Sequence, residues 1–227
     1  TPAHQYPMGV TLHPDRRRQL ISWARETGAL VIEDDYDGEF RYDRRPVGAL
    51  QEMGPDCVAY LGTTSKTLGP ELRLGWMVLP PARVDAAIEA KLHADHHTDA
   101  LAQLALANLL STYAYDRHVR TRRLRYRGRR DLLQTVLGES TKFGAAGFRL
   151  EGIAAGLHAL LTLPLGGEGE AEVRTRAEAA GLGVGYLGEH WHRPGTHPQG
   201  VIVGFGASSD AAYPAAVKAL VAVLTNA

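Results

Sequence analysis

The chain has 227 residues, 44% of them hydrophobic and 22% charged, which suffices for one large or two small globular domains. Its 25 basic residues balance 25 acidic ones, so no overall charge draws it to nucleic acid or a membrane surface. The single cysteine, Cys57, excludes an internal disulfide framework and favours a reducing compartment, so we expect a cytoplasmic protein. No apolar run approaches the ~18 residues of a membrane span.

The first half of the chain alternates helical patterns with short apolar runs. Residues 15–28 have helical spacing and end on Gly28, which is typical of a helix stop. The expected strands are 29–35, 57–63 and 72–80, and the expected helical segments are 81–94 and roughly 98–137. This alternation predicts an α/β fold in which the loops at strand ends carry the chemistry.

The second half has a different pattern. A helix is expected over 170–181, strands over 182–187 and 201–206, and a closing helix from about Tyr213. These elements predict a smaller α+β unit. We therefore expect a large domain over residues 1–140, including the long connecting helix, and a small C-terminal domain over 141–227.

A lysine stands in a polar turn between two expected strands, in the segment YLGTTSKTLGPELRLGW (60–76). An amine is nucleophilic only when neutral, and burial or a cationic neighbour lowers its pKa toward that state. The flanking apolar runs predict partial burial of Lys66, and Arg73 would add a positive charge if it folds back. The hydroxyls of Thr63 and Ser65, with the Arg73 guanidinium, suit a phosphate group. The alternative is a surface lysine in a Ser/Thr turn.

The segment VIEDDYDGEF (31–40) places acids at the end of a strand. Asp34 and Tyr36 are two residues apart and share a face if the strand continues. A carboxylate there could hold a protonated ring nitrogen, and a phenol could bond a ring oxygen. A solvated acidic loop is the plain alternative. The pair Asp34 and Asp35, with a threonine and a lysine, also resembles the magnesium pocket of a receiver domain, but such a signalling module is short and leaves the second half unexplained.

Three further features favour ordinary structural roles. The arginines of residues 117–130 spread around a helix axis, which favours a solvated or interface helix over a nucleic-acid contact. The histidines in 93–97 and 189–197 match no zinc spacing, so no metal site is expected. His158 is expected to be a packed histidine rather than a catalyst.

The segments TPAHQYPMG, IEDDYDGEF, TTSKTLGPELRLGW, HVRTRRLRYRGRRDLL and GIAAGLHALLTL occur in this order. Together they resemble the aminotransferase-like domain of the MocR/GabR-type regulators of the GntR superfamily, from residue 1 to about residue 206. The resemblance implies a fold type I domain that binds pyridoxal 5'-phosphate (PLP), with a mostly parallel sheet in its large part. It also implies that part of the cofactor site and a winged-helix DNA-binding domain lie upstream of Thr1.

The resemblance also implies roles for individual residues. Lys66 would form the aldimine with PLP, Asp34 would pair with the pyridinium nitrogen, and Tyr36 would contact the ring hydroxyl. The remaining candidates for cofactor binding are Thr63, Ser65 and Arg73 at the phosphate, and Tyr6, which stands where aminotransferases have asparagine.

Two departures from the enzymes favour sensing over catalysis. Tyr6 precedes Pro7 in place of asparagine, and Gly200 and Val201 stand where a substrate-carboxylate arginine is expected, with Arg193 the nearest candidate. We therefore expect an effector-sensing domain with little or no turnover, and a functional aminotransferase is the alternative. The expected partners are an amino compound or PLP itself as effector, a second copy of the chain, and DNA only through a domain outside this chain.

Overall fold

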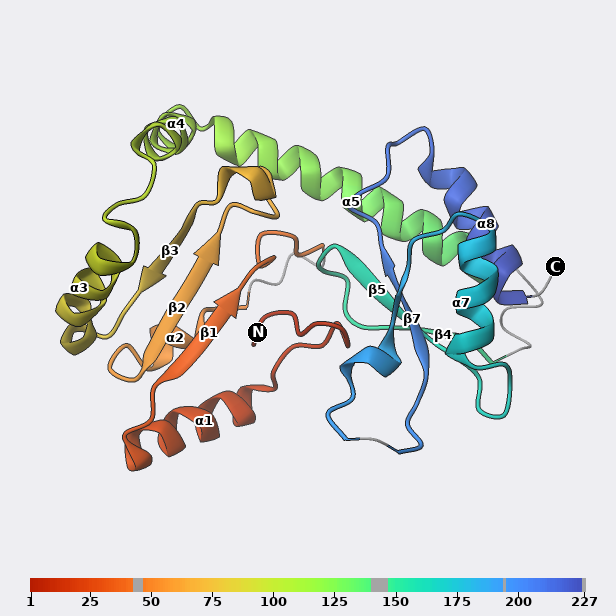
Figure 1. Ribbon diagram of the computed structural model, residues 1–227, viewed down its shortest axis with the longest axis horizontal. Helices are drawn as coiled ribbons and strands as arrows, with labels where there is room; N and C mark the ends of the chain where they lie inside the picture. Colours follow the sequence, from red (N-terminus) through yellow and green to blue (C-terminus); the bar gives the residue numbers. More distant parts are fainter. Residues whose placement is uncertain (43–46, 140–146, 194, 226–227) are drawn as a thin grey trace. The chain divides into compact units, whose positions relative to one another are not determined.

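The computed structural model describes residues 1–42, 47–139, 147–193 and 195–225 (Figure 1). The chain divides into two compact units, Thr1–Gln5 with Val10–Arg123 and Tyr6–Gly9 with Leu124–Ala227. The expected domain boundary between residues 140 and 141 lies outside the described residues and stays a prediction.

The first unit contains a three-stranded sheet in the order β1-β2-β3 (Figure 1). Its strands are β1 (Val31–Asp35), β2 (Val58–Thr63) and β3 (Gly75–Val78). β1 and β2 are parallel, with Asp35 opposite Gly62, whereas β2 and β3 are antiparallel, with Thr63 opposite Gly75. All three strands lie within the runs that the sequence predicted. The third is shorter than expected because its predicted start falls in a 3₁₀ turn, η1 (Pro70–Leu72).

Helices α1 (Pro14–Thr27) and α2 (Leu50–Met53) cover one face of this sheet. Their apolar residues pack on β2 in a core cluster that contains Ile21, Ala24, Leu50, Cys57 and Val58. α1 ends as predicted, since Gly28 takes the left-handed conformation (φ 68°) and its N–H bonds the Ala24 carbonyl.

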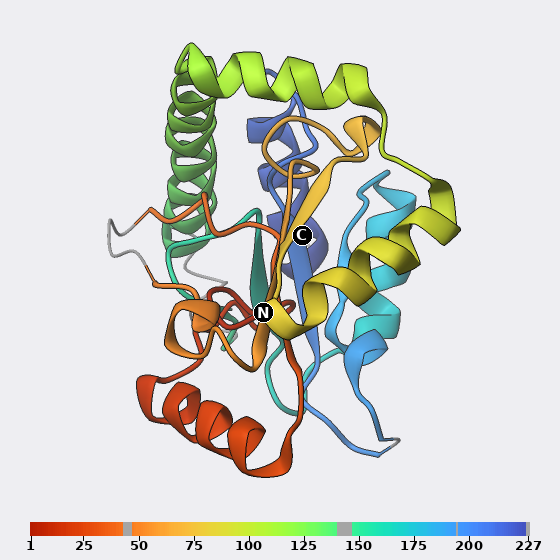
Figure 2. The same ribbon diagram turned by 90° about the vertical axis from the view of Figure 1, so that its left-hand side faces the viewer.

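The connecting segment contains three α-helices, best followed in Figure 2. A 3₁₀ turn, η2 (Pro81–Arg83), precedes α3 (Val84–Asp95). The long helical segment expected over 98–137 is two helices, α4 (Ala100–Ser111) and α5 (Ala114–Glu139). They are separated at Tyr113, whose positive φ of 55° cannot continue a right-handed helix. No helix in the described part of the chain is both long and apolar enough to cross a membrane.

The second unit is built on an antiparallel sheet in the order β4-β5-β7-β6. The strands are β4 (Arg149–Glu151), β5 (His158–Thr162), β6 (Gly185–Tyr186) and β7 (Gly200–Gly204), and the helices are α7 (Glu170–Ala179) and α8 (Tyr213–Thr225). β6 is shorter than predicted because the chain turns into η3 (Leu187–His190) directly after Tyr186. The α+β character of this half agrees with the sequence.

A buried carboxylate joins β1 to α2. Glu33 is only 2% exposed, and its two oxygens accept hydrogen bonds from the backbone N–H groups of Leu50 (2.8 Å) and Gln51 (2.9 Å). These amides begin α2 and have no partner within the helix. Glu33, on strand β1, therefore caps the N-terminus of α2.

We expect Glu33→Ala to lower the free energy of unfolding by about 2–4 kcal/mol, because it leaves two amides of α2 without their acceptor. Denaturant unfolding of both proteins measures the loss. The matched control is Glu26→Ala on the exposed surface of α1, which should change stability by no more than about 0.5 kcal/mol. Equal effects of the two substitutions would contradict this role of Glu33.

Candidate functional site

Two loops that carry the predicted residues follow neighbouring strand ends. We call residues 34–40 the acidic loop and residues 63–69 the lysine turn. Because β1 and β2 are parallel and Asp35 pairs with Gly62, both loops leave the sheet at the same edge. The alternation along β1 buries Glu33 toward α2 and leaves Asp34 exposed on the opposite face. The register thus gathers residues that lie some 30 positions apart in sequence.

The lysine turn is closed by hydrogen bonds around Thr64. Its carbonyl accepts from the backbone N–H groups of Leu68 (2.9 Å) and Gly69 (3.3 Å). Thr64 and Thr67 are buried, whereas Lys66 between them is exposed. The predicted partial burial of Lys66 is therefore wrong. The physical reason is that the two threonines turn inward, so the residue between them points outward beyond the end of β2.

Hydroxyl groups gather on the first residues of the turn. Thr63 Oγ1 lies 2.9 Å from Ser65 Oγ and accepts from the Ser65 backbone N–H at 3.1 Å. The Leu74 carbonyl accepts from the backbone N–H of Thr64 at 3.0 Å and from its hydroxyl at 3.1 Å. The backbone next to Arg73 is therefore folded back on the turn, and the expected charge of the Arg73 guanidinium near Lys66 stays a prediction.

Arg73 itself takes a left-handed conformation (φ 50°) with an exposed side chain. A guanidinium, hydroxyl groups and an amine, as supplied here by Arg73, Thr63, Ser65 and Lys66, are donors that suit a ligand with a phosphate and an electrophilic carbon. The chemistry of this set fits the cofactor that the sequence predicted.

Position 62, directly before Thr63, requires glycine because the Trp76 ring occupies the space of a side chain. The sequence did not indicate this requirement. A Cβ atom on Gly62 would lie 2.3 Å from Cε2 of the Trp76 ring on β3. Any side chain there would displace Trp76 from its place beside the end of β2.

The acidic loop divides its carboxylates between structural and accessible positions. Asp35 accepts from the Tyr60 hydroxyl (2.8 Å) and from the Gly38 backbone N–H (3.0 Å), while Asp34 is exposed. Burial, together with the bond to Asp35, raises the pKa of the Tyr60 phenol. Asp34 is therefore the accessible carboxylate of the pair. A magnesium pocket built on both aspartates loses support, because Asp35 is already engaged.

The N-terminal segment fixes the rest of this loop. His4 Nδ1 lies 2.8 Å from a carboxylate oxygen of Asp37, with both side chains buried. The Tyr36 hydroxyl donates to the His4 carbonyl at 3.2 Å. Tyr36, two residues after Asp34 in the acidic loop, is thus tied to the N-terminal segment. His4 and Asp37 were not expected to pair, because nothing in the local sequence marks two polar residues 33 positions apart as a buried pair.

Helix α5 contacts both loops, a connection that the sequence did not reveal. The Tyr115 hydroxyl lies 3.3 Å from Glu39 Oε1 and 3.2 Å from Thr67 Oγ1, and His118 Nε2 donates to the Thr67 carbonyl at 2.8 Å. Burial raises the pKa of the Glu39 carboxyl, and the nearby Asp35 carboxylate raises it further. One of the arginines of α5 is also engaged within the chain, since Arg123 Nε donates to the Glu39 carbonyl at 2.8 Å.

Tyr6 belongs to the second unit. Its ring, 43% exposed, makes edge contacts with the rings of His158 (4.8 Å between centroids) and His190 (5.2 Å). His158 is buried, and its Nε2 lies 3.3 Å from the Pro7 carbonyl, so the expectation of a packed histidine is confirmed. The other six candidates all belong to the first unit, and the roles of all seven at the cofactor stay predictions.

The positions where an arginine was expected lie inside the second sheet. A Cβ atom on Gly200 would stand 2.9 Å from the Leu161 carbonyl oxygen, and Val201 is fully buried. Neither position has room for a guanidinium. Arg193 is exposed in the segment before β7.

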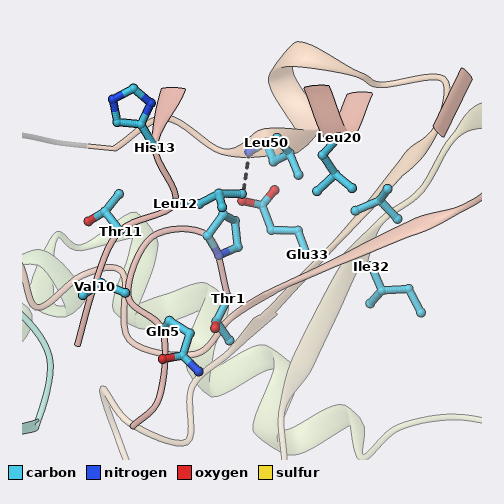
Figure 3. A pocket seen from close by; sticks show the side chains of 12 residues that line it. Thr1, Gln5, Val10, Thr11, Leu12, His13, Leu20, Ile32, Glu33 and Leu50 are labelled. Atoms are coloured by element: carbon cyan, nitrogen blue, oxygen red, sulfur yellow. Dashed lines mark hydrogen bonds between the residues drawn. The ribbon is translucent and has the colours of Figure 1, made fainter. Parts of the chain in front are cut away.

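An apolar cavity of about 320 Å³ lies elsewhere in the first unit, between the N-terminal segment, α1 and β1 (Figure 3). Its lining includes Val10, Leu12, Leu20 and Ile32, together with Glu33. The Glu33 carboxylate already bonds the start of α2, as the dashed line in Figure 3 shows. None of the predicted site residues lines this cavity.

Residues 5–161 match the family model described as Aminotransferase class I and II. Two curated relatives are regulators. The HTH-type pyridoxine biosynthesis transcriptional regulator PdxR of Corynebacterium glutamicum is 37% identical over 214 residues, covering 92% of this chain and 44% of the relative. The uncharacterized HTH-type transcriptional regulator YhdI of Bacillus subtilis is 38% identical over 168 residues, covering 72% of this chain and 34% of the relative.

A solved enzyme structure has the same fold. The chain is similar to Pyrococcus horikoshii kynurenine aminotransferase, in complex with PMP, with a TM-score of 0.85 and 28% identity over 99% of this chain and 55% of the enzyme chain. The expected α/β fold is confirmed. The chain thus spans less than half the length of the two regulators and about half that of the enzyme.

Proposed function

Because the chain belongs to the class I and II aminotransferase family, we propose that it is the PLP-binding, effector-sensing part of a MocR-type transcriptional regulator. The observation that carries the proposal is the lysine turn. It holds the exposed Lys66 directly after the hydrogen-bonded hydroxyls of Thr63 and Ser65 in the chain, at the sheet edge where the acidic loop also begins.

Each residue of this edge has a defined task in the proposal. Thr63, Ser65 and Arg73 would hold the phosphate, with the guanidinium giving a charge-assisted bond. Asp34 would face the pyridinium nitrogen, and Tyr36 would contact the ring hydroxyl. Lys66 Nζ would attack the aldehyde carbon, with loss of one water. When bound, the cofactor supplies an electron-withdrawing ring that stabilises negative charge on the carbon next to an attached amine nitrogen.

Two observations favour sensing over turnover. The two regulators named above are 37% and 38% identical to this chain, compared with 28% for the kynurenine aminotransferase. In addition, Gly200 and Val201 cannot accept the arginine that would hold a substrate carboxylate. A sensor needs only a ligand that binds two conformations differently, and product release is unnecessary. We infer that the effector is an amino compound or PLP itself. A functional aminotransferase remains the alternative.

DNA binding enters this proposal only through a part of the regulator outside this chain. The support is the "HTH-type" description of the two relatives, of which this chain covers 34% and 44%.

The first test is covalent attachment of PLP in the complete protein. We expect PLP to give a visible absorbance band that Lys66→Ala abolishes, because no other amine stands in the lysine turn. Absorbance spectra and mass spectrometry after borohydride reduction measure the attachment and its position. The control is Lys218→Ala on the exposed side of α8, which should leave the band unchanged. Attachment at an unchanged level in Lys66→Ala would refute the proposal.

The second test separates a sensor from an enzyme. With a panel of amino donors and a keto acid, we expect steady-state turnover well below ~1 per second, the lower end of the usual enzyme range. The reason is that a substrate carboxylate without a bidentate partner loses binding energy and alignment. An amine that shifts the absorbance band without forming product supports sensing. Turnover within ~1–1000 per second would favour the aminotransferase alternative.

We also propose that the protein is a homodimer. Helix α4 exposes leucines, with Leu101 77% and Leu104 66% exposed. On the same unit, an apolar groove of about 500 Å³ lies between β3 and α3 and is lined by Trp76, Met77 and Ile88. A leucine-rich helix and an apolar groove on one chain can be self-complementary, as a two-fold symmetric interface requires.

The complete protein is therefore expected to sediment with the mass of two chains. Glu at both Leu101 and Leu104 should convert it to a monomer, because carboxylates in an apolar interface lose their hydration without a partner. The control is Leu165→Glu, at a loop position in the second unit that is 96% exposed. Sedimentation velocity gives the masses, and an intact dimer in the α4 double variant would exclude α4 from the interface.

A further inference from the structure

The turn that carries Lys66 is held from outside by α5. Thr67, the next residue after Lys66, is 3% exposed and is contacted at both of its polar oxygens. Its carbonyl accepts from His118 Nε2 at 2.8 Å, and its hydroxyl lies 3.2 Å from the Tyr115 hydroxyl. Tyr115 and His118 are three residues apart, so they share one face of α5.

The hydrogen bonds continue from Thr67 into the turn itself. The Thr67 hydroxyl donates to the Thr64 carbonyl at 3.3 Å, the same oxygen that accepts from the Leu68 and Gly69 amides. The proton of the Thr67 hydroxyl therefore points to the Thr64 carbonyl. In the hydrogen bond between Tyr115 and Thr67, the Tyr115 hydroxyl is the donor. The result is a chain of donors from Tyr115 through Thr67 to the carbonyl that closes the lysine turn.

Tyr115 also reaches the acidic loop. Its hydroxyl lies 3.3 Å from Glu39 Oε1, and Arg123, further along α5, donates to the Glu39 carbonyl. Because the single proton of the Tyr115 hydroxyl is used at Thr67, the bond that fastens the acidic loop to α5 is the one from Arg123, and both loops of the candidate site are held by one helix. Lys66 lies between two inward-facing threonines and has an exposed amine, so its direction depends on how firmly its turn is held.

We propose that Tyr115 is a positioning residue, which through Thr67 orients Lys66 for attack on the cofactor aldehyde. This inference rests on the proposed function, because it concerns the same lysine. Tyr115 touches neither the amine nor any reacting atom. It acts by limiting the conformations of the turn, and restricted geometry is worth a large factor in the rate of a bond-forming step.

The test compares attachment with binding in the complete protein. We expect Tyr115→Phe and Thr67→Val to slow the covalent attachment of PLP about tenfold, the factor that corresponds to losing one hydrogen bond. The affinity for pyridoxamine 5'-phosphate, which has no aldehyde, should stay within about twofold of the wild type. Thr67→Ser keeps the hydroxyl and should restore the rate. The matched control is Tyr113→Phe, two residues from Tyr115, where the ring is 69% exposed.

A second readout needs no cofactor. Hydrogen exchange of the Leu68 and Gly69 amides, which bond the Thr64 carbonyl, should be faster in Tyr115→Phe than in Tyr113→Phe. Wild-type attachment rate and unchanged amide exchange in Tyr115→Phe would overturn the proposal. Equal losses in attachment and in pyridoxamine 5'-phosphate affinity would also overturn it, because they indicate a purely structural role. A wild-type protein that never attaches PLP at Lys66 would instead refute the proposed function, and the positioning role with it.

Discussion

The parallel pairing of β1 with β2 is the constraint on which the candidate site depends. The carboxyl ends of two parallel strands lie at the same edge of the sheet. The pairing of Asp35 with Gly62 places the last residues of β1 and β2 next to each other. The acidic loop and the lysine turn become neighbours for this reason. A shift of register by one residue would turn Asp34 toward α2 and Glu33 away from it, so the same pairing fixes both the exposed carboxylate and the buried cap.

Hydrogen bonding decides which residues near this edge remain accessible to a ligand. Asp35 is used by Tyr60 and Gly38, and Thr64 and Thr67 are turned into the unit, whereas Asp34 and Lys66 are exposed. The site therefore consists of accessible groups held by engaged neighbours. Such an arrangement keeps an amine and a carboxylate oriented without burying either charge, which would be costly without a partner.

The family relationship and the details of the second unit bear on different questions. The match to aminotransferase class I and II accounts for the fold. The closed space around Gly200 and Val201 bears on whether a carboxylate could be held there for catalysis. A chain can keep the architecture of an enzyme family while its sites are changed for another purpose, and function has to be argued from the sites.

The sequence by itself determined the order of most elements, with α2, β4 and β5 as the exceptions, because apolar periodicity and end signals such as Gly28 are local properties. It also indicated the candidate cofactor-binding residues, since the motifs around Asp34 and Lys66 are short and continuous. It could not determine that Lys66 is exposed, that Tyr113 divides a helical segment, or that α5 holds the lysine turn through Thr67. Those features depend on contacts such as Tyr115 with Thr67, 48 residues apart, and no local pattern records which distant side chain will supply a partner. Tertiary structure decided them, because each buried polar group has to find a hydrogen bond wherever the fold offers one.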